Sequence, residues 1–161
     1  MTIEEIAKLM VTKGKGILAA DESTGTMGKR LKSVNVESNE KNRLHFRETL
    51  FTSDSMKTSI SGVILYDETI RQTSSKGVLI PELIKKSGSI PGIKVDKGAK
   101  LLAGSDDEKI TEGLDGLRER MEEYYKLGAR FAKWRAVYSI SSKHPSKQCI
   151  KANAHALARY A

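Results

Sequence analysis

The chain has 161 residues, of which 39% are hydrophobic and 30% are charged, and this is enough for one globular domain with its own core. No apolar run approaches the roughly 20 residues that a membrane-spanning helix needs, and the N-terminal residues lack the pattern of a signal peptide. The single cysteine, Cys149, favours a cytoplasmic location, and the net charge of +8 with only 6% aromatic residues favours phosphorylated metabolites over nucleic acid as partners.

The first predicted elements are a short helix and a strand. Thr2 and Glu5 have the spacing of a capping box, and the apolar residues that follow predict an amphipathic helix that ends at residues 14–16. The continuous apolar run of residues 17–20 predicts a strand that is buried on both faces. Asp21 comes at the carboxyl end of this strand.

A small polar segment follows Asp21. Its backbone amides and its hydroxyls, which include those of Ser23 and Thr26, can hold an oxyanion, and Arg30 follows one helical turn later. The alternative interpretation is that Asp21 and Ser23 only cap the next helix.

The next helix is predicted over residues 39–51. Its apolar residues are expected to turn inward, and its arginines to lie on the exposed or site-facing side. The inward residues are Leu44, Leu50 and Phe51, and the arginines are Arg43 and Arg47.

Two strands and a short helix are predicted in the middle of the chain. Residues 60–68 have the pattern of a second buried strand that ends in acids, and residues 79–86 form a short helix or turn. Residues 93–98 predict a third strand, which is short and polar and carries Lys94 and Asp96 on one side. An exposed edge strand with self-paired charges is the alternative interpretation of this third strand.

The last third of the chain predicts a helix, a strand and a helix. Residues 111–127 have the clearest apolar stripe of any helix in the sequence. Residues 131–140 predict a buried fourth strand, in which Lys133 and Arg135 point the same way because they are two positions apart. These cations either face an anion or belong to an ordinary solvated strand face. The final helix begins at Pro145.

Strands and helices therefore alternate four times along the chain. This alternation predicts an α/β fold with parallel strands and right-handed crossovers. The charged and hydroxylic groups follow the carboxyl ends of the strands, which is the face where (β/α)8 barrels carry their active sites. Four units do not close an eight-stranded barrel, so the chain is either a small open sheet or half of a larger fold.

Several segments, in order along essentially the whole chain, resemble the class I fructose-bisphosphate aldolases. Any one segment is weak, but so many in register make the resemblance specific. They are residues 16–25 (GILAADESTG), 42–44 (NRL), 62–65 (GVIL), 68–69 (ET), 92–98 (GIKVDKG), 113–117 (GLDGL), 128–135 (GARFAKWR) and 156–161 (ALARYA).

The resemblance implies a TIM (β/α)8 barrel, of which residues 1–161 would form the N-terminal half with about four β/α units. The family cleaves fructose 1,6-bisphosphate to dihydroxyacetone phosphate and glyceraldehyde 3-phosphate in glycolysis and gluconeogenesis. The reaction runs through a Schiff base on a lysine, without metal or other cofactor. The resemblance also implies a homo-oligomer, commonly a tetramer. The cytoplasmic location, the absence of a membrane partner and the preference against nucleic acid are expectations from the composition.

The resemblance also assigns roles to particular residues. Asp21 would orient the substrate hydroxyls and handle protons, and Lys133 would stabilise negative charge near the breaking carbon–carbon bond. The other matched residues would bind the substrate: Ser23, Thr26, Lys94 and Arg135 hold the phosphate at the aldehyde end, and Arg30 and Arg43 lie near the substrate phosphates. Where this chain has Thr26 the family more often has serine, which preserves the hydroxyl.

The family's Schiff-base lysine belongs to the sixth strand, so we expect it outside this chain and expect the fragment alone to be inactive. Lys133 is the only substitute that the chain offers, by similarity to transaldolases, in which a fourth-strand lysine is the nucleophile. We expect the chain to be the N-terminal half of a longer or split aldolase that works with the remaining half of the barrel. The alternatives are a non-catalytic half that binds sugar phosphates and, suggested only by charge, a nucleic-acid-binding domain.

Overall fold

The computed structural model describes all residues from Met1 to Ala161 and divides into two compact units. The first unit comprises residues 1–94 and 123–132, and the second comprises residues 95–122 and 133–161. No helix in either unit combines the length and the apolar character that crossing a membrane requires.

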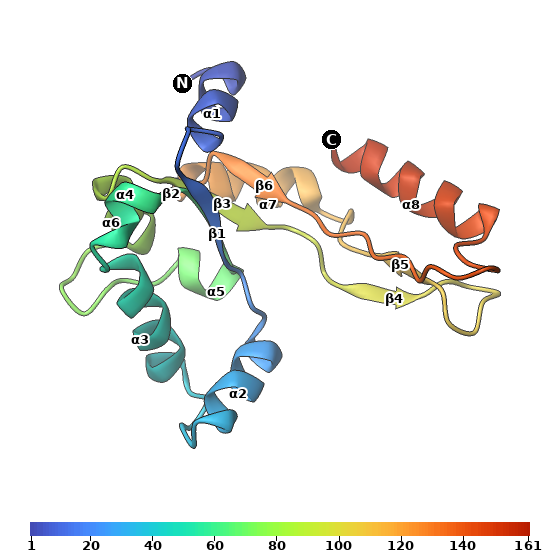
Figure 1. The fold of residues 1–161 in the computed structure, drawn as a ribbon, viewed down its shortest axis with the longest axis horizontal. Helices are drawn as coiled ribbons and strands as arrows, with labels where there is room; N and C mark the ends of the chain where they lie inside the picture. Colours follow the sequence, from blue (N-terminus) through green and yellow to red (C-terminus); the bar gives the residue numbers. More distant parts are fainter. The chain divides into compact units, whose positions relative to one another are not determined.

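A four-stranded sheet forms the centre of the first unit (Figure 1). Its order is β1-β2-β3-β6, and β2 pairs in parallel with both β1 and β3, as the alternation of elements predicted. Ala20 is in register with Leu65, and Leu65 is in register with Ile93. The carboxyl ends of these three strands therefore meet at one edge of the sheet. The strands are β1 (Gly16–Ala20), β2 (Ile60–Leu65), β3 (Ile90–Lys94) and β6 (Phe131–Lys133).

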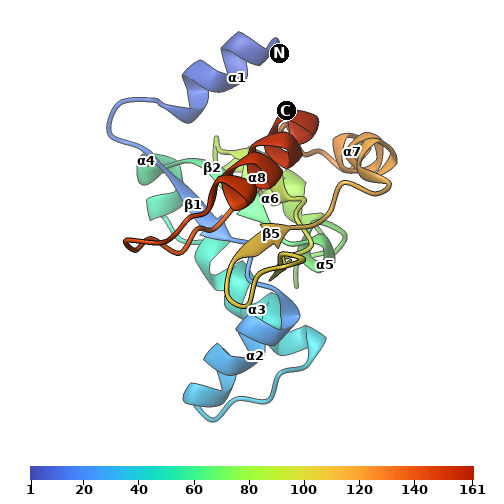
Figure 2. The ribbon, with the colours of Figure 1, turned by 90° about the vertical axis from the view of Figure 1, so that its right-hand side faces the viewer.

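Six helices accompany the sheet in the first unit, and a seventh, α7, runs across the boundary between the units. The capping box at the start of α1 is confirmed, because the Glu5 amide donates to Thr2 Oγ1 at 3.2 Å and the Thr2 amide donates to Glu5 Oε2 at 2.8 Å. Helices α2 and α3 lie against each other in both ribbon views (Figures 1 and 2). The helices are α1 (Ile3–Met10), α2 (Thr24–Ser33), α3 (Glu40–Phe51), α4 (Ser55–Ser59), α5 (Asp67–Ile70), α6 (Ile80–Lys86) and α7 (Leu117–Lys126).

The first strand is less buried than its sequence predicted. Ile17 is 43% exposed, because β1 lies at the end of the sheet and has β2 as its neighbour in the strand order. The inward orientation predicted for Leu50 is also wrong, since this side chain is 37% exposed at the end of α3. Phe51 is buried as expected.

The third strand begins and ends earlier than predicted. It starts at Ile90 rather than at Ile93 and ends at Lys94, so Asp96 lies beyond it. The alternative of an exposed edge strand is wrong, because β3 lies between β2 and β6 and its first four residues are buried. Pro91 and Gly92, which precede the predicted strand, belong to β3 itself.

The second unit contains a two-stranded hairpin and the C-terminal helix (Figures 1 and 2). Strands β4 (Ala99–Leu101) and β5 (Lys109–Thr111) pair in antiparallel fashion, and α8 (Lys147–Tyr160) packs on β5. Asn153 anchors this packing, because its Nδ2 donates to the Lys109 carbonyl at 2.9 Å. Cys149 and Ala156 are buried on this helix, which begins at Lys147 rather than at Pro145 as predicted.

Several predicted elements are shorter in the structure. Helix α1 ends at Met10 rather than at residues 14–16, and β2 ends at Leu65 rather than at residue 68 because residues 67–70 form α5. Helix α7 begins at Leu117 rather than at Thr111, because residues 109–111 pair with the first strand of the hairpin and Gly113 and Gly116 have φ values of 130° and 61°. Strand β6 ends at Lys133 instead of continuing to residue 140, and its residues are only half-buried. Past its end, the Arg135 carbonyl accepts from the Thr111 hydroxyl at 2.7 Å, a side-chain bond in place of a bond to a neighbouring strand.

Gly92 is expected to be essential to the packing of β3 in the first unit. A Cβ at this position would lie 2.3 Å from Phe131 Cζ, so the Gly92→Ala variant must displace the ring. We expect its free energy of unfolding to fall by about 1–3 kcal/mol, as for other overpacked cores. Gly16→Ala is the matched control, because its Cβ would meet nothing within 4 Å. Equal urea midpoints for the two variants would contradict this prediction.

Candidate functional site

The strand register of the first unit gathers polar residues at one edge of the sheet. Asp21 directly follows the last residue of β1, and Lys94 is the last residue of β3. Because Ala20, Leu65 and Ile93 are in register across β1, β2 and β3, the positions of Asp21 and Lys94 lie at the same level of the sheet, with one strand between them. The expectation that charged groups collect at the carboxyl ends of the strands is therefore confirmed for this unit.

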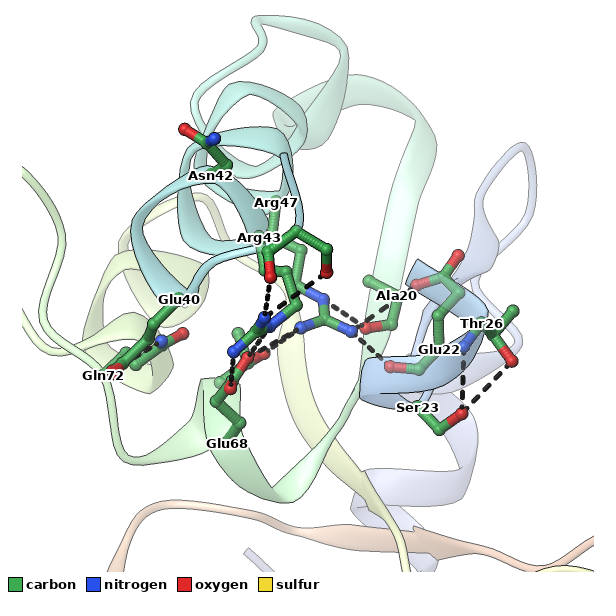
Figure 3. A network of polar contacts seen from close by, with 12 residues as sticks. Ala20, Glu22, Ser23, Thr26, Glu40, Asn42, Arg43, Arg47, Glu68 and Gln72 are labelled. Atoms are coloured by element: carbon green, nitrogen blue, oxygen red, sulfur yellow. Dashed lines mark hydrogen bonds and ion pairs between the residues drawn. The ribbon is translucent and has the colours of Figure 1, made fainter. Parts of the chain in front are cut away.

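Ser23 and Thr26 lie at the start of α2. Ser23 is the N-cap of this helix, and its Oγ accepts from the Thr26 amide at 3.3 Å and lies 3.1 Å from the Thr26 hydroxyl (Figure 3). Ser23 thus caps the helix, whereas Asp21, the other residue of that alternative interpretation, is not its N-cap. Thr24, Gly25 and Thr26 are exposed, so the amides and hydroxyls of the first turn lie on the surface. Such a helix start suits a phosphate group.

Arg30 is held close to this helix start by an acid. It forms an ion pair with Glu22, which is the second residue after β1. The Arg30 side chain is 56% exposed and that of Glu22 is 10% exposed. The cation therefore remains at the surface while its partner is largely buried.

Arg43 donates two hydrogen bonds to Glu68 of α5. Its Nε donates to Glu68 Oε1 at 2.9 Å and its Nη2 donates to Glu68 Oε2 at 2.6 Å (Figure 3). These bonds hold the pKa of Glu68 below its usual range and raise the pKa of Arg43. Arg43 is only 9% exposed. Of the two alternatives predicted for Arg43, the exposed side of the helix is wrong, because an acid from a different part of the chain compensates its charge in the interior. The site-facing alternative stays a prediction.

Arg47 was predicted on the exposed or site-facing side of its helix, but no role was assigned to it from the sequence and its burial at this edge was not predicted. It is 1% exposed, and its guanidinium donates to the Ala20 carbonyl, the Glu22 carbonyl and the Thr69 hydroxyl. Burial lowers its pKa, whereas the nearby charges of Glu22 and Glu68 raise it. The available signal was the spacing of Arg43 and Arg47, because two arginines four residues apart on one helix share a face.

Lys133 and Arg135 belong to the second unit. The Lys133 carbonyl accepts from the Val95 amide at 3.1 Å, and the Lys133 side chain is half-buried. The Arg135 side chain is exposed. Arg120 fixes the neighbouring backbone, because its Nη1 donates to the Val95 carbonyl at 3.0 Å. No three His, Cys, Asp or Glu side chains gather in an arrangement that could hold a metal ion.

Comparison with known proteins identifies similar sequences along the whole chain. The family model for "Fructose-bisphosphate aldolase class-I" matches residues 2–161. A "Probable fructose-bisphosphate aldolase class 1" of Xylella fastidiosa (strain Temecula1) is 58% identical over 164 residues, which cover 100% of this chain and 49% of the relative. The "Fructose-bisphosphate aldolase, cytoplasmic isozyme 1" of Pisum sativum is 57% identical over 155 residues, which cover 96% of this chain and 43% of the relative.

A solved structure is similar over nearly the same length. It is fructose-bisphosphate aldolase from Plasmodium falciparum, determined in complex with TRAP and a small-molecule inhibitor. The match has a TM-score of 0.94 and 47% sequence identity, and it covers 98% of this chain and 46% of that one. This chain therefore spans about half the length of the curated relatives and of the solved structure that it matches.

Proposed function

The chain belongs to the class I fructose-bisphosphate aldolase family, and we propose that it supplies the first half of an active site that cleaves fructose 1,6-bisphosphate to dihydroxyacetone phosphate and glyceraldehyde 3-phosphate. The fold class predicted from the sequence, that of the TIM barrel, is confirmed by the match to a solved aldolase. The chain covers about the first four β/α units of that fold. One observation carries the proposal: the similarity extends over the entire chain at 58% identity.

The residues that follow the strands have the chemistry that carbon–carbon cleavage requires. A base must remove the proton of the substrate hydroxyl as the bond breaks, and the electron pair must pass to a protonated imine. Asp21 is the proposed proton-handling carboxylate, and Lys133 stabilises the negative charge that develops. The Schiff-base lysine comes from residues outside this chain.

Phosphate binding is assigned to the remaining predicted residues. Hydroxyls, helix-start amides and cations are the groups that hold phosphate esters in proteins. Support in the first unit comes from the exposed start of α2 and the cation at the end of β3. The proposed ligands of the two substrate phosphates are Ser23, Thr26, Arg30, Arg43, Lys94 and Arg135.

The family relationship also supports proposals about partners and location. We assign this chain to a cytoplasmic homo-oligomer, a tetramer by resemblance, in which the second half of the barrel completes the site. The name of the pea relative, a cytoplasmic isozyme, supports this location. The reaction needs neither metal nor another cofactor, and nucleic acid and membrane are not among the proposed partners.

Reductive trapping of the Schiff base tests the proposed function. The joined enzyme consists of residues 1–161 followed by the C-terminal half of the Xylella fastidiosa relative, in place of the relative's own aligned segment. After incubation with dihydroxyacetone phosphate and sodium borohydride, we expect one adduct by intact mass, located in the C-terminal half. We expect no adduct on the 161-residue chain alone. An adduct on Lys133 would overturn this assignment, and a joined enzyme that folds but neither traps nor cleaves substrate would overturn the proposed activity.

A non-catalytic sugar-phosphate-binding half is the second candidate function. It is favoured by one observation, namely that the polar edge of the first unit is assembled within this chain alone. Calorimetry of the 161-residue chain with fructose 1,6-bisphosphate tests it. Tight binding by the chain, together with a joined enzyme that gives no turnover, would favour this second function over catalysis.

A further inference from the structure

The guanidinium of Arg47 bonds to the backbone on both sides of Asp21. Its Nε donates to the Ala20 carbonyl at 3.1 Å, and its Nη2 donates to the Glu22 carbonyl at 2.5 Å. Figure 3 shows the guanidinium of this α3 residue between that backbone and Glu68. The third donor, Nη1, bonds to the Thr69 hydroxyl at 2.7 Å.

Burying this cation is costly, which points to a specific role. Arg47 is 1% exposed, and desolvation is the largest influence on its pKa, in the lowering direction. The carboxylates near it are too far away for a hydrogen bond, since Arg47 Nη2 lies 3.8 Å from Glu22 Oε2 and Arg47 Nη1 lies 3.9 Å from Glu68 Oε1. Since buried ion pairs often give little net stability, stability alone is a weak reason for placing an arginine here.

The geometry of the two carbonyl bonds determines what Arg47 controls. Strand β1 ends at Ala20, so the regular hydrogen bonding of the sheet stops just before Asp21. In extended backbone, the carbonyls of residues two positions apart point the same way, so one planar guanidinium can reach both. The two bonds hold the peptide group that precedes Asp21 and the peptide group that follows Glu22. They therefore limit how the backbone between them can turn, and with it the direction of the Asp21 Cα–Cβ bond.

We propose that Arg47 is a positioning residue that orients Asp21 for the proton transfer of the aldolase reaction. The proposal rests on the proposed function for the role of Asp21. The two hydrogen bonds from Arg47 to the Ala20 and Glu22 carbonyls, called the clamp below, are a property of the structure alone. Arg47 acts through the backbone and needs no contact with substrate. Lysine cannot replace it, because an ammonium lacks the rigid fork that reaches two carbonyls together.

The test compares Arg47→Lys with a matched control in the joined enzyme. Ser61→Ala is the control, because Ser61 is also buried and also donates from its side chain to two backbone carbonyls, those of Met10 and Gly16. It lies at the opposite end of the strands from Asp21. We expect Arg47→Lys to lower kcat by about 100-fold, as for a catalytic group displaced by about 1 Å, with KM changed by less than about threefold. Ser61→Ala is expected to change neither, even where both variants lose similar thermal stability.

Amide hydrogen exchange on the 161-residue chain supplies a readout that does not depend on activity. We expect the amides of residues 21–23 to exchange faster in Arg47→Lys and to be unchanged in Ser61→Ala. If the lysine variant does not fold, Arg47→Gln, whose amide reaches one carbonyl, replaces it. A kcat within about twofold of the parent in Arg47→Lys, or in Arg47→Gln where it is used instead, overturns the proposal. An equal loss of kcat in Ser61→Ala also overturns it. A parent enzyme that folds but is inactive contradicts the proposed function instead, and the exchange result still decides whether the clamp exists.

Discussion

The Asp21→Asn variant of the joined enzyme is expected to lose about 1,000-fold in kcat for fructose 1,6-bisphosphate cleavage, within the usual range for a lost acid–base group. Asparagine has the same shape but cannot accept the proton of the substrate hydroxyl. Because the phosphate-binding groups are unchanged, KM should remain close to that of the parent. A coupled assay that follows NADH oxidation through the triose-phosphate products measures both constants.

Asp67→Asn is the matched control for this variant. Asp67 also follows a strand of the same sheet, but its carboxylate accepts from Arg71 Nη2 at 2.8 Å and from the Tyr124 hydroxyl at 2.9 Å. It has no proposed role in the reaction, so we expect its kcat to match that of the parent. If Asp21→Asn retained more than about a tenth of the parent kcat, Asp21 could not be the proton-handling group.

Glu68→Gln is expected to have the largest effect on the stability of the first unit. The substitution removes the charge that compensates Arg43, which is 9% exposed, and Arg47, which is 1% exposed. Losing one partner of a buried ion pair leaves an uncompensated cation, and we expect the free energy of unfolding of the 161-residue chain to fall by about 2–3 kcal/mol at pH 7. Urea denaturation followed by circular dichroism measures it.

The effect of Glu68 should depend on pH in the acid range. Its pKa is lower in the folded chain than the ordinary value of 4.5, chiefly because Arg43 donates to its carboxylate. The stabilisation by the ionised form is therefore fully present above pH 4.5 and is lost as the pH falls through the lower pKa of the folded state. The difference in stability between the parent and Glu68→Gln should accordingly shrink as the medium is acidified.

The exposed ion pair of Glu82 with Lys85 provides the control for Glu68→Gln. Both partners are well exposed, with side-chain exposures of 50% and 38%, and such pairs contribute little. We expect Glu82→Gln to unfold at nearly the same urea concentration as the parent at every pH. A Glu68→Gln variant as stable as Glu82→Gln at pH 7 would show that the burial of Arg43 and Arg47 does not require the charge of Glu68.

The elements that the sequence predicted correctly are those with strong local signals. The capping box at Thr2 and Glu5 and the helix that follows Asn39 each depend on neighbouring residues, and each lies where it was predicted. The apolar run of residues 60–65 forms β2, although the prediction extended this strand to residue 68. The order of strands and helices then led to parallel pairing, because short crossovers of this kind have few alternatives.

Long-range contacts decide the elements that the sequence did not predict. The helix predicted over residues 111–127 begins only at Leu117, and Thr111 belongs instead to β5, which forms because it pairs with residues 99–101. In the same way, Arg47 is of a residue type that usually lies at the surface, yet it is buried because it donates to the carbonyls of Ala20 and Glu22. These carbonyls lie 27 and 25 positions away in the chain, so no local pattern indicates the contact.

The partners of the α3 arginines become available at different times during synthesis at the ribosome. Arg43 and Arg47 leave the ribosome after Glu22 but before Glu68, so the nascent chain holds two cations that cannot yet be buried with all their partners. Thr69, the third hydrogen-bond partner of Arg47, is made directly after Glu68. The surroundings of Asp21 can therefore be completed only once α5 has been translated, and a nascent chain halted before that point carries the residue without the frame that orients it.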